Sequence, residues 1–306
     1  MSFSSEVKEE LAEHIDSSRH CQIAEMAALF VCSGKIECEK AGKTVLAIQT
    51  ENEQVIRKYF TLLQKSFKIC TSAIQKSPYL LEICEDKYVE KLIQALKLSD
   101  TAEGKMPEDG IVNPLLIKNS CCRRAFLRGM YLAAGSMSDP EKSYHLEFVC
   151  RTEHQAVQLQ EIICDFQIEA RVIVRKNHFI VYIKEGSGIV DLLNVTGAHV
   201  SLMNLENLRI VKEMRNSINR RVNCEAANIT KTVNASSKQT EDIILIQNTL
   251  GLKGLPDSLR EIAEIRLEYP DATLKELGRY LNPPVGKSGV NHRLRKLSEI
   301  AERIRG

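Results

Sequence analysis

The sequence lacks any apolar run long enough to cross a membrane. Its longest apolar stretches, such as Ile23–Cys32 and Ile243–Ile246, fall well short of the ~20 residues that a membrane-spanning helix needs. The N-terminal stretch Met1–Asp16 is acidic and amphipathic, which is unlike the basic and then apolar pattern of a signal peptide. We therefore expect a cytoplasmic protein with no membrane partner.

The sequence also lacks the pattern Cys-x-x-Cys, although it contains 10 cysteines. Most of them occur singly in apolar stretches, which is typical of reduced, buried thiols rather than of disulfides. The adjacent pair Cys121–Cys122 cannot direct both side chains at one metal ion from a helix unless other residues supply further ligands. The sequence therefore predicts no disulfide framework, no metal site and no cofactor.

Net charge is small, with a formal value of +2 over 306 residues. A role in nucleic-acid binding must then depend on local clusters of Lys and Arg rather than on total charge. The apolar fraction of 43% and the charged fraction of 27% are typical of a globular protein and argue against extensive disorder. A chain of this length has room for two or three domains, each with its own core.

The N-terminal two thirds of the sequence contain an internal repeat, with two copies about 100 residues apart. Each copy has the periodicity of helix, strand pair, helix, strand pair and helix. The strands and helices that we can delimit in the first copy are Cys21–Ser33, Thr44–Gln49, Asn52–Lys65, Lys68–Ile74, Tyr79–Cys84 and Asp86–Leu98. Those in the second copy are Ser120–Ala134, Tyr144–Cys150, Thr152–Asp165, Ala170–Arg175, Phe179–Lys184 and Gly188–Leu193. The predicted fold class is α+β, with two tandem αββαββα halves.

The first helix of each copy carries small residues and ends at a glycine, Gly34 in one and Gly135 in the other. Small side chains allow two helix backbones to approach closely. A glycine at the end of a helix commonly adopts the left-handed conformation that other residues resist. We therefore expect the two helices to pack on each other at a pseudo-twofold axis, each with a left-handed glycine cap.

Two such halves resemble the LAGLIDADG homing endonuclease fold. The resemblance implies an acidic residue directly before each glycine, where it would bind the metal ion that assists DNA cleavage. Ser33 and Ala134 occupy these positions, and neither is acidic. Glu25 and Glu37 lie nearby in the sequence, but neither has an acidic counterpart in the second half. We therefore predict no catalytic residues and no enzymatic activity. The alternative is a vestigial nuclease that uses an unpaired carboxylate such as Glu25.

The segment Ser201–Asn248 shows no strand periodicity and predicts one or two long polar helices. Between Lys212 and Lys238 it holds six basic residues against two acidic ones. One interpretation is that cationic side chains here contact phosphate groups of DNA. The other is that Asn223, Glu225 and Asn228 cap helices and join them through a buried polar network. The possible phosphate contacts, two of them in the second copy of the repeat, are Arg171, Arg175, Arg220, Arg221 and Lys231.

The C-terminal stretch predicts a three-helix module that contains a helix-turn-helix over residues 272–304. One helix begins near Asp257, and a second covers Leu274–Leu281. The third begins near Ser288 and carries a continuous apolar stripe. That stripe consists of Val290, Leu294, Leu297, Ile300 and Ile304.

Charge distinguishes the third helix from an ordinary bundle helix, because the four basic residues Lys287, Arg293, Arg295 and Lys296 occur with no acidic residue before Glu299. A recognition helix reaches base edges in the major groove from its first turns. Gly289 would allow close approach of a phosphate, and the free N–H groups at the helix start would donate to it. The predicted DNA-binding residues are Lys275, Lys287, Ser288, Gly289, Asn291, His292, Arg293, Arg295 and Lys296.

Four strings of sequence together resemble the WhiA family of bacterial regulators over the whole chain. They are Gly135–Phe148, Asn219–Thr232, Thr273–Gly278 and Lys287–Leu297. The resemblance implies a sequence-specific, double-stranded DNA-binding protein that controls transcription in cell division, chromosome segregation and, in spore formers, sporulation. It also implies degenerate LAGLIDADG halves, in agreement with Ser33 and Ala134.

The expected domains are a first half with an N-terminal helix over residues 1–104, a second half over 105–200, a basic helical linker over 201–250 and a helix-turn-helix domain over 251–306. We expect a nucleoid-associated protein with DNA as its partner and a monomer as the slightly favoured state. Transcription or cell-division proteins are further possible partners. An interaction scaffold for that machinery is the third functional hypothesis.

Overall fold

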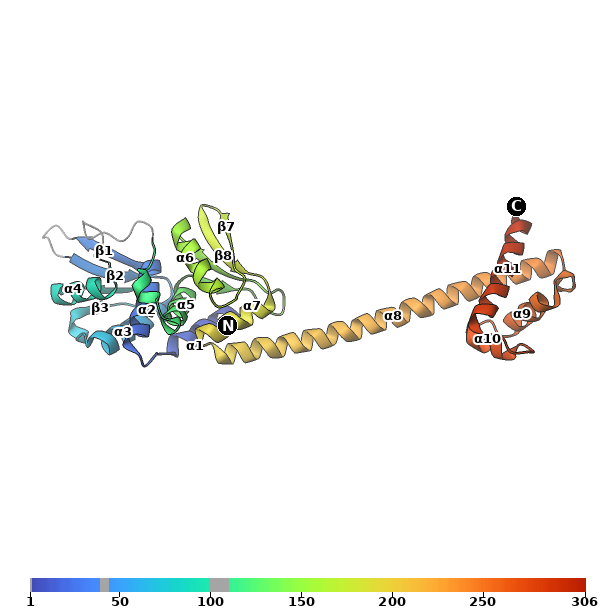
Figure 1. The fold of residues 1–306 in the computed structure, drawn as a ribbon, viewed down its shortest axis with the longest axis horizontal. Helices are drawn as coiled ribbons and strands as arrows, with labels where there is room; N and C mark the ends of the chain where they lie inside the picture. The colour runs from blue at the N-terminus through green and yellow to red at the C-terminus, as the bar shows by residue number, and fades with distance from the viewer. Residues whose placement is uncertain (1, 39–43, 99–109) are drawn as a thin grey trace. The chain divides into compact units, whose positions relative to one another are not determined.

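The computed structural model describes residues 2–38, 44–98 and 110–306 and divides into two compact units, Met1–Val211 and Lys212–Gly306 (Figure 1). The first unit contains all the β-strands of the described residues, and the second is helical. None of the helices in the described ranges combines the length and apolar character that crossing a bilayer requires. The α+β class predicted from the sequence is confirmed.

The first half of unit one is a four-stranded antiparallel sheet with its helices. Its strand order is β1-β2-β4-β3. Its elements are α2 (Arg19–Ser33), β1 (Gly34–Cys38), β2 (Thr44–Gln49), α3 (Glu53–Phe67), η1 (Thr71–Ala73), β3 (Ile74–Lys76), β4 (Leu80–Ile83) and α4 (Asp86–Ala95).

The second half repeats this arrangement after the short helix η2 (Pro114–Ile117). Its antiparallel strand order, β5-β6-β8-β7, corresponds position for position to that of the first half. The internal repeat inferred from the sequence is therefore confirmed. The elements are α5 (Ser120–Ala134), β5 (Gly135–Met137), β6 (Leu146–Cys150), α6 (Glu153–Cys164), β7 (Arg171–Arg175), β8 (His178–Ile183) and α7 (Gly186–Thr196).

One strand prediction is wrong over most of its length. The segment Lys68–Ile74 was expected to be extended, but pairing begins only at Ile74. Lys68 adopts a left-handed conformation with φ of 52°, and it ends α3. The chain then passes through the short helix η1 before it enters the sheet, so alternation of residue types in this segment reflects a packed turn and not a strand.

The glycines that end α2 and α5 differ from the expected left-handed caps. Their φ values are −82° at Gly34 and −81° at Gly135, and both continue directly into strands. A Cβ atom at Gly34 would lie 2.4 Å from Cδ2 of Phe30, and one at Gly135 would lie 2.7 Å from Cδ2 of Tyr131. Glycine is required at these positions because an aromatic ring one turn earlier occupies the space of a side chain.

Helices α2 and α5 pack tightly against each other between the two sheets, as the small residues predicted (Figure 1). A Cβ atom at Gly129 of α5 would lie 2.7 Å from the carbonyl oxygen of Glu25 and 2.8 Å from Cβ of Ala28. Each helix end is also held by the opposite half. The guanidinium of Arg151 donates to the carbonyl oxygen of Cys32, and Asn52 Nδ2 donates to the Leu132 carbonyl oxygen at 3.4 Å.

A buried ionic cluster lies beside this helix crossing. Lys58 Nζ is 3.0 Å from Glu25 Oε1, and both side chains are 0% exposed. Arg128 NH1 is 3.3 Å from the other Glu25 oxygen and 2.7 Å from Asp16 Oδ2. Burial raises the pKa of Glu25 and lowers that of Lys58, while the attraction between the two groups opposes both shifts. Lys58 also donates to the carbonyl oxygens of Leu11 and His14, so the ammonium is fully occupied.

The N-terminal helix α1 (Phe3–Glu13) fixes the start of the long helix α8 (His199–Thr249). The Glu10 carboxylate accepts hydrogen bonds from the backbone N–H groups of Val200 at 2.7 Å and of Ser201 at 2.9 Å. A carboxylate at this position satisfies free N–H groups and interacts favourably with the helix dipole. Of the two alternatives for the segment Ser201–Asn248, a single continuous helix is correct.

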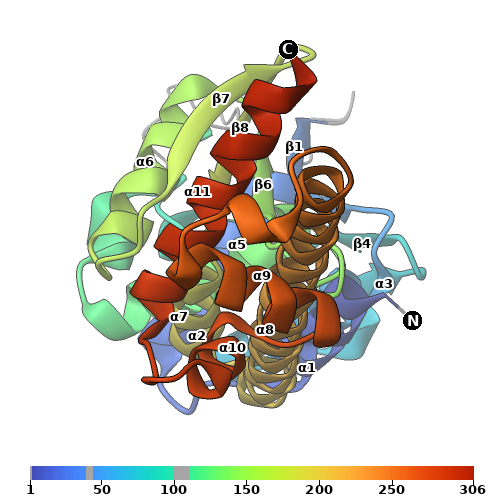
Figure 2. The same cartoon turned by 90° about the vertical axis from the view of Figure 1, so that its right-hand side faces the viewer.

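The second unit consists of the C-terminal part of α8 and three shorter helices, with η3 (Leu252–Gly254) between them (Figure 2). The shorter helices are α9 (Asp257–Glu268), α10 (Leu274–Tyr280) and α11 (Lys287–Arg305). Ile243 and Ile246 of α8 pack into the same core as the buried residues of the three helices. The predicted stripe on α11 is confirmed at Val290, Leu294 and Leu297, with Ala301 buried beside it.

Replacing Lys58 by Met tests the buried ionic cluster. We expect a loss of about 3–5 kcal/mol of stability, because Glu25 would keep its buried charge with only Arg128 to compensate it. The double variant Glu25→Gln/Lys58→Met should lose less than the sum of the two single changes. Denaturant unfolding, with hydrogen exchange read on α2 peptides, measures the effect. Lys65→Met, which changes an exposed lysine of the same helix, is the control. Additive single effects would contradict a coupled pair.

Candidate nucleic-acid interface

The corner between α10 and α11 depends on Gly278. A Cβ atom there would lie 2.1 Å from the carbonyl oxygen of Val285 and 3.2 Å from Cγ2 of Val290. The Val285 N–H donates to the Gly278 carbonyl oxygen at 2.9 Å. The turn therefore folds back directly onto α10 and sets the direction in which α11 leaves it.

Helix α10 has a capping box that fixes its first turn. The Thr273 hydroxyl accepts from the backbone N–H of Glu276 at 3.4 Å, and the Glu276 carboxylate accepts from the Thr273 N–H at 2.8 Å. The hydrogen bonds that the Glu276 carboxylate accepts from the Thr273 N–H and hydroxyl lower its pKa. Reciprocal capping satisfies two N–H groups that a helix end otherwise leaves free, so a helix of 7 residues is sharply delimited.

Two polar side chains of α9 hold the loops on either side of α10. Arg266 is 2% exposed and donates from NH1 to the carbonyl oxygens of Ala272 at 2.7 Å and Pro270 at 3.2 Å. Glu261 accepts from the backbone N–H of Asn282 at 2.8 Å. The sequence pattern does not indicate a role for either residue, because Arg266 occupies an apolar position of the helical pattern and Glu261 occupies an ordinary polar position.

Most of the predicted DNA-binding residues are exposed in the second unit. The exposed side chains are Lys275, Lys287, Ser288, Asn291, His292, Arg295 and Lys296. Helix α11 begins after Gly286, and no side chain caps its first N–H groups. Such a helix start carries donors and a partial positive charge that suit a phosphate. The arrangement combines cations, short polar side chains and free backbone donors within the first three turns of one helix.

Three residues of the predicted set have intramolecular contacts that the sequence did not indicate, and one of them, Arg295, pairs with Glu299 of the same helix at 3.3 Å. Arg293 turns toward α9, with NH1 at 3.9 Å from Glu261 Oε2 and 3.5 Å from the carbonyl oxygen of Ser258. A Cβ atom at Gly289 would lie 2.4 Å from Cγ1 of Val285. Gly289 thus accommodates the turn before α11, and Arg293 ties α11 to α9.

Arg220, Arg221 and Lys231 of α8 are exposed. The helix is continuous through Asn223, Glu225 and Asn228, and these three side chains are exposed as well. The alternative of a buried polar network is therefore wrong. In the second half, Arg171 pairs with Glu169 at 2.6 Å, while Arg175 is exposed at the end of β7.

The residues that end α2 and α5 are Ser33 and Ala134, and neither is acidic. Glu25 is fully buried, and its two oxygens lie 3.0 Å from Lys58 Nζ and 3.3 Å from Arg128 NH1.

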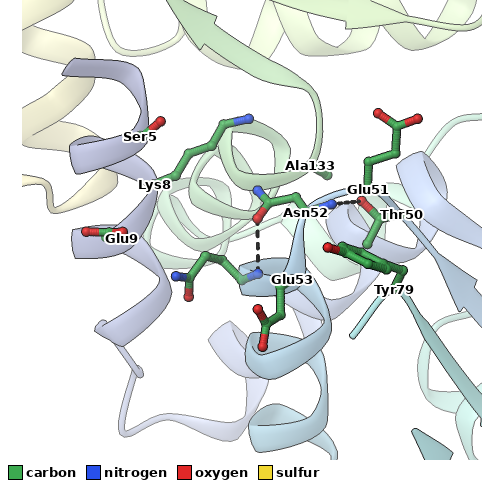
Figure 3. Close-up of a pocket in the computed structure, with 10 residues that line it drawn as sticks. Ser5, Lys8, Glu9, Thr50, Glu51, Asn52, Glu53, Tyr79 and Ala133 are labelled. Carbon is green, nitrogen blue, oxygen red and sulfur yellow. Dashed lines mark hydrogen bonds between the residues drawn. The ribbon is translucent and has the colours of Figure 1, made fainter. Parts of the chain in front are cut away.

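A pocket of about 720 Å³ lies beside the end of α5, between α1 and the start of α3 (Figure 3). Its charged lining consists of Lys8 and three carboxylates, Glu9, Glu51 and Glu53. The excess of negative charge disfavours a phosphate group. Among the described residues, these carboxylates do not converge closely enough to share a metal ion. The lining of this pocket therefore suits neither a phosphate group nor a metal ion shared by these carboxylates.

Comparisons with known proteins cover all parts of the chain. The model of the WhiA N-terminal LAGLIDADG-like domain matches residues 19–99, that of the WhiA LAGLIDADG-like domain matches 123–215, and that of the WhiA C-terminal HTH domain matches 218–301. A probable cell division protein WhiA of Lachnoclostridium phytofermentans is 52% identical, with 100% of both chains covered. Another, of Clostridium beijerinckii, is 48% identical over 100% of this chain and 99% of the relative.

A solved structure also resembles the chain over its length. The crystal structure of full-length DUF199/WhiA from Thermatoga maritima is 26% identical, with a TM-score of 0.60 and 99% of both chains covered. The arrangement of two LAGLIDADG-like halves followed by a helical C-terminal region is therefore found in an experimentally solved protein.

Replacing Gly278 by Ala tests the corner. Intrinsic helix propensity alone would make the variant more stable by about 0.5–1 kcal/mol. We expect the opposite, a loss of about 1–3 kcal/mol, because the new methyl group would overlap backbone atoms of the turn. Hydrogen exchange of α10 and α11 peptides in the full chain measures the change. Gly254→Ala, where the added Cβ meets nothing within 4 Å, is the matched control. Equal or slower exchange in Gly278→Ala would show that the contact is not rigid.

Proposed function

Because the chain belongs to the WhiA family, we propose that it is a non-enzymatic regulator that binds specific sequences of double-stranded DNA. The observation that carries the proposal is the α10–α11 corner, which exposes cations and short polar side chains at the start of α11. Helix-turn-helix proteins place this part of the second helix in the major groove. The basic residues of α10 and α11 supply positive charge at this corner even though the net charge of the chain is only +2.

We assign base reading to the first turns of α11. Asn291 is suited to pair with adenine and Arg295 with guanine, because their side chains can form two hydrogen bonds to those bases. Ser288 and His292 lie exposed on the same part of the helix. Arg293 is assigned a positioning role instead, since its guanidinium is directed at α9.

Phosphate binding is assigned to the flanking cations. Lys275 on α10 and Lys287 and Lys296 on α11 are exposed, and the free N–H groups at the start of α11 add neutral donors. Further phosphate contacts are proposed for exposed cations outside the α10–α11 corner. These are Arg171, Arg175, Arg220, Arg221 and Lys231. One of these cations, Arg171, is partly neutralised by its ion pair with Glu169.

The biological role is proposed from the relatives, which are named probable cell division proteins. We infer a nucleoid-associated transcriptional regulator in cell division and chromosome segregation, and in sporulation where the organism forms spores. A cellular test separates this role from that of an interaction scaffold. Variants of α11 that no longer bind DNA should fail to complement a deletion strain, whereas full complementation would favour the scaffold.

The absence of enzymatic activity is proposed from Ser33, Ala134 and the buried Glu25. The residues that end the two helices are not acidic, and Glu25 is already paired with Lys58 and Arg128. Supercoiled plasmid DNA incubated with the protein and Mg²⁺ or Mn²⁺ should stay intact. Metal-dependent nicking that Glu25→Gln abolishes would restore the nuclease alternative.

Salt dependence tests the DNA interface. If about 4–6 cations meet phosphates, the logarithm of the association constant should fall against the logarithm of salt concentration with a slope of about −4 to −5. Lys287→Ala and Lys296→Ala should each reduce the slope by about 0.9. Fluorescence anisotropy with duplex DNA measures it, and Lys253→Ala, an exposed lysine before α9, is the control. A wild-type slope near zero, or an equal effect of the control, would contradict the proposed interface.

Asn291→Ala tests base reading separately from phosphate binding. It should weaken binding to the preferred sequence by about 1–3 kcal/mol and leave the salt slope unchanged, because an amide releases no counterions. Selection of bound sequences from a random DNA pool reports whether the preference relaxes at a defined base pair. An unchanged preference would remove Asn291 from the reading surface.

A further inference from the structure

Four potential metal ligands meet where α2 and α5 begin, at the opposite end of these helices from Ser33 and Ala134. His20 and Cys21 come from α2, and Cys121 and Cys122 come from α5. Their ligand atoms all lie within 4.8 Å of one another. No other group of three or more His, Cys, Asp or Glu side chains in the described part of the chain is as close.

The distances in the cluster suit a single ion. His20 Nδ1 lies 3.2 Å from Cys122 Sγ, 3.3 Å from Cys21 Sγ and 4.0 Å from Cys121 Sγ. A tetrahedral zinc ion with Zn–S bonds of about 2.3 Å places neighbouring ligand atoms about 3–4 Å apart. Little movement of the side chains is needed to reach that geometry.

We propose that His20, Cys21, Cys121 and Cys122 form a structural zinc site that joins the two halves of the first unit. Three thiolates and one imidazole are a standard ligand set for structural Zn²⁺, and soft sulfur ligands disfavour Mg²⁺ and Ca²⁺. All four protein ligands are supplied, as expected for a structural site rather than one that keeps a position open for a substrate.

The surroundings of the cluster fit this role. Cys21 and Cys122 are buried and pack with Ala24 and Ala125 in a small cluster of their own, while His20 and Cys121 are exposed. The exposed pair gives an ion a path from solvent to the buried thiols. The cluster also lies at the starts of two helices of 15 residues each.

The internal repeat explains how adjacent residues become joint ligands. His20 and Cys21 occupy the same positions in the first half as Cys121 and Cys122 do in the second, each 101 residues apart. Two helix starts that face each other across the pseudo-twofold axis direct both pairs at one point. The sequence predicts no metal site, because Cys121–Cys122 lacks further ligands nearby in the chain; the fold supplies them from the other half.

Metal titration of the full chain tests the proposal. The protein is purified under reducing conditions, treated with a chelator and titrated with Zn²⁺ or, as a spectroscopic probe, Co²⁺. We expect one ion per chain, a thiolate-to-cobalt charge-transfer band and the d–d bands of tetrahedral cobalt. Zn²⁺ should also raise the melting temperature, because an ion that binds only the folded state stabilises it.

Variants identify the ligands. Cys121→Ser and His20→Gln change exposed side chains, so the fold should persist by circular dichroism while the charge-transfer intensity and the thermal shift by Zn²⁺ fall. Cys164→Ser, an exposed cysteine at the end of α6, should keep both. The proposal is overturned if wild-type protein binds no ion, or if Cys121→Ser/His20→Gln binds Zn²⁺ as wild type does. It is also overturned if the cysteines form a disulfide in the cell and the reduced chain takes up no Zn²⁺.

Discussion

The contact of two helix backbones at Gly129 is the constraint on which the first unit depends. It brings α5 within van der Waals distance of the Glu25 carbonyl group and so places the two sheets on either side of one helix pair. The same approach buries Glu25 against Lys58 and Arg128 and brings the cysteine pairs of the two helix starts together. At the other end of the helix pair, Ser33 and Ala134 occupy the positions where the LAGLIDADG resemblance implies acidic residues.

In the second unit, too, a glycine allows two segments of backbone to approach closely. Gly278 lets the turn before α11 lie directly on α10, and Arg266 and Glu261 hold the flanking loops from α9. Rigid support of this kind matters for recognition, since side chains read bases only when the helix that carries them is held in a fixed direction. The direction of α11 therefore depends on Gly278 and on residues of α9 that support the corner.

Much of the fold could be predicted from the sequence because periodicity reports which face of an element is buried. The repeat, the paired helices and the stripe at Val290, Leu294 and Leu297 follow from that signal, and the exposed cations of α11 follow from charge clustering. Contacts between distant segments could not be predicted in this way. The orientation of Arg293 toward Glu261, the burial of Arg266 and the meeting of His20 with Cys122 depend on tertiary geometry. The reason predicted for glycine at position 34, a left-handed cap, is wrong. Sequence alone does not distinguish such a cap from a position where a neighbouring side chain leaves no room for a Cβ atom.

Hydrogen exchange of the full chain with and without a short DNA duplex at low salt tests the central claim most directly, because it reports every helix start and strand at once. The account predicts that DNA slows exchange chiefly at the start of α11 and in α10, with the buried helices α2 and α5 unchanged. Protection confined to the strands of Met1–Val211, with none in α11, would contradict it and would place DNA binding on the LAGLIDADG-like halves instead.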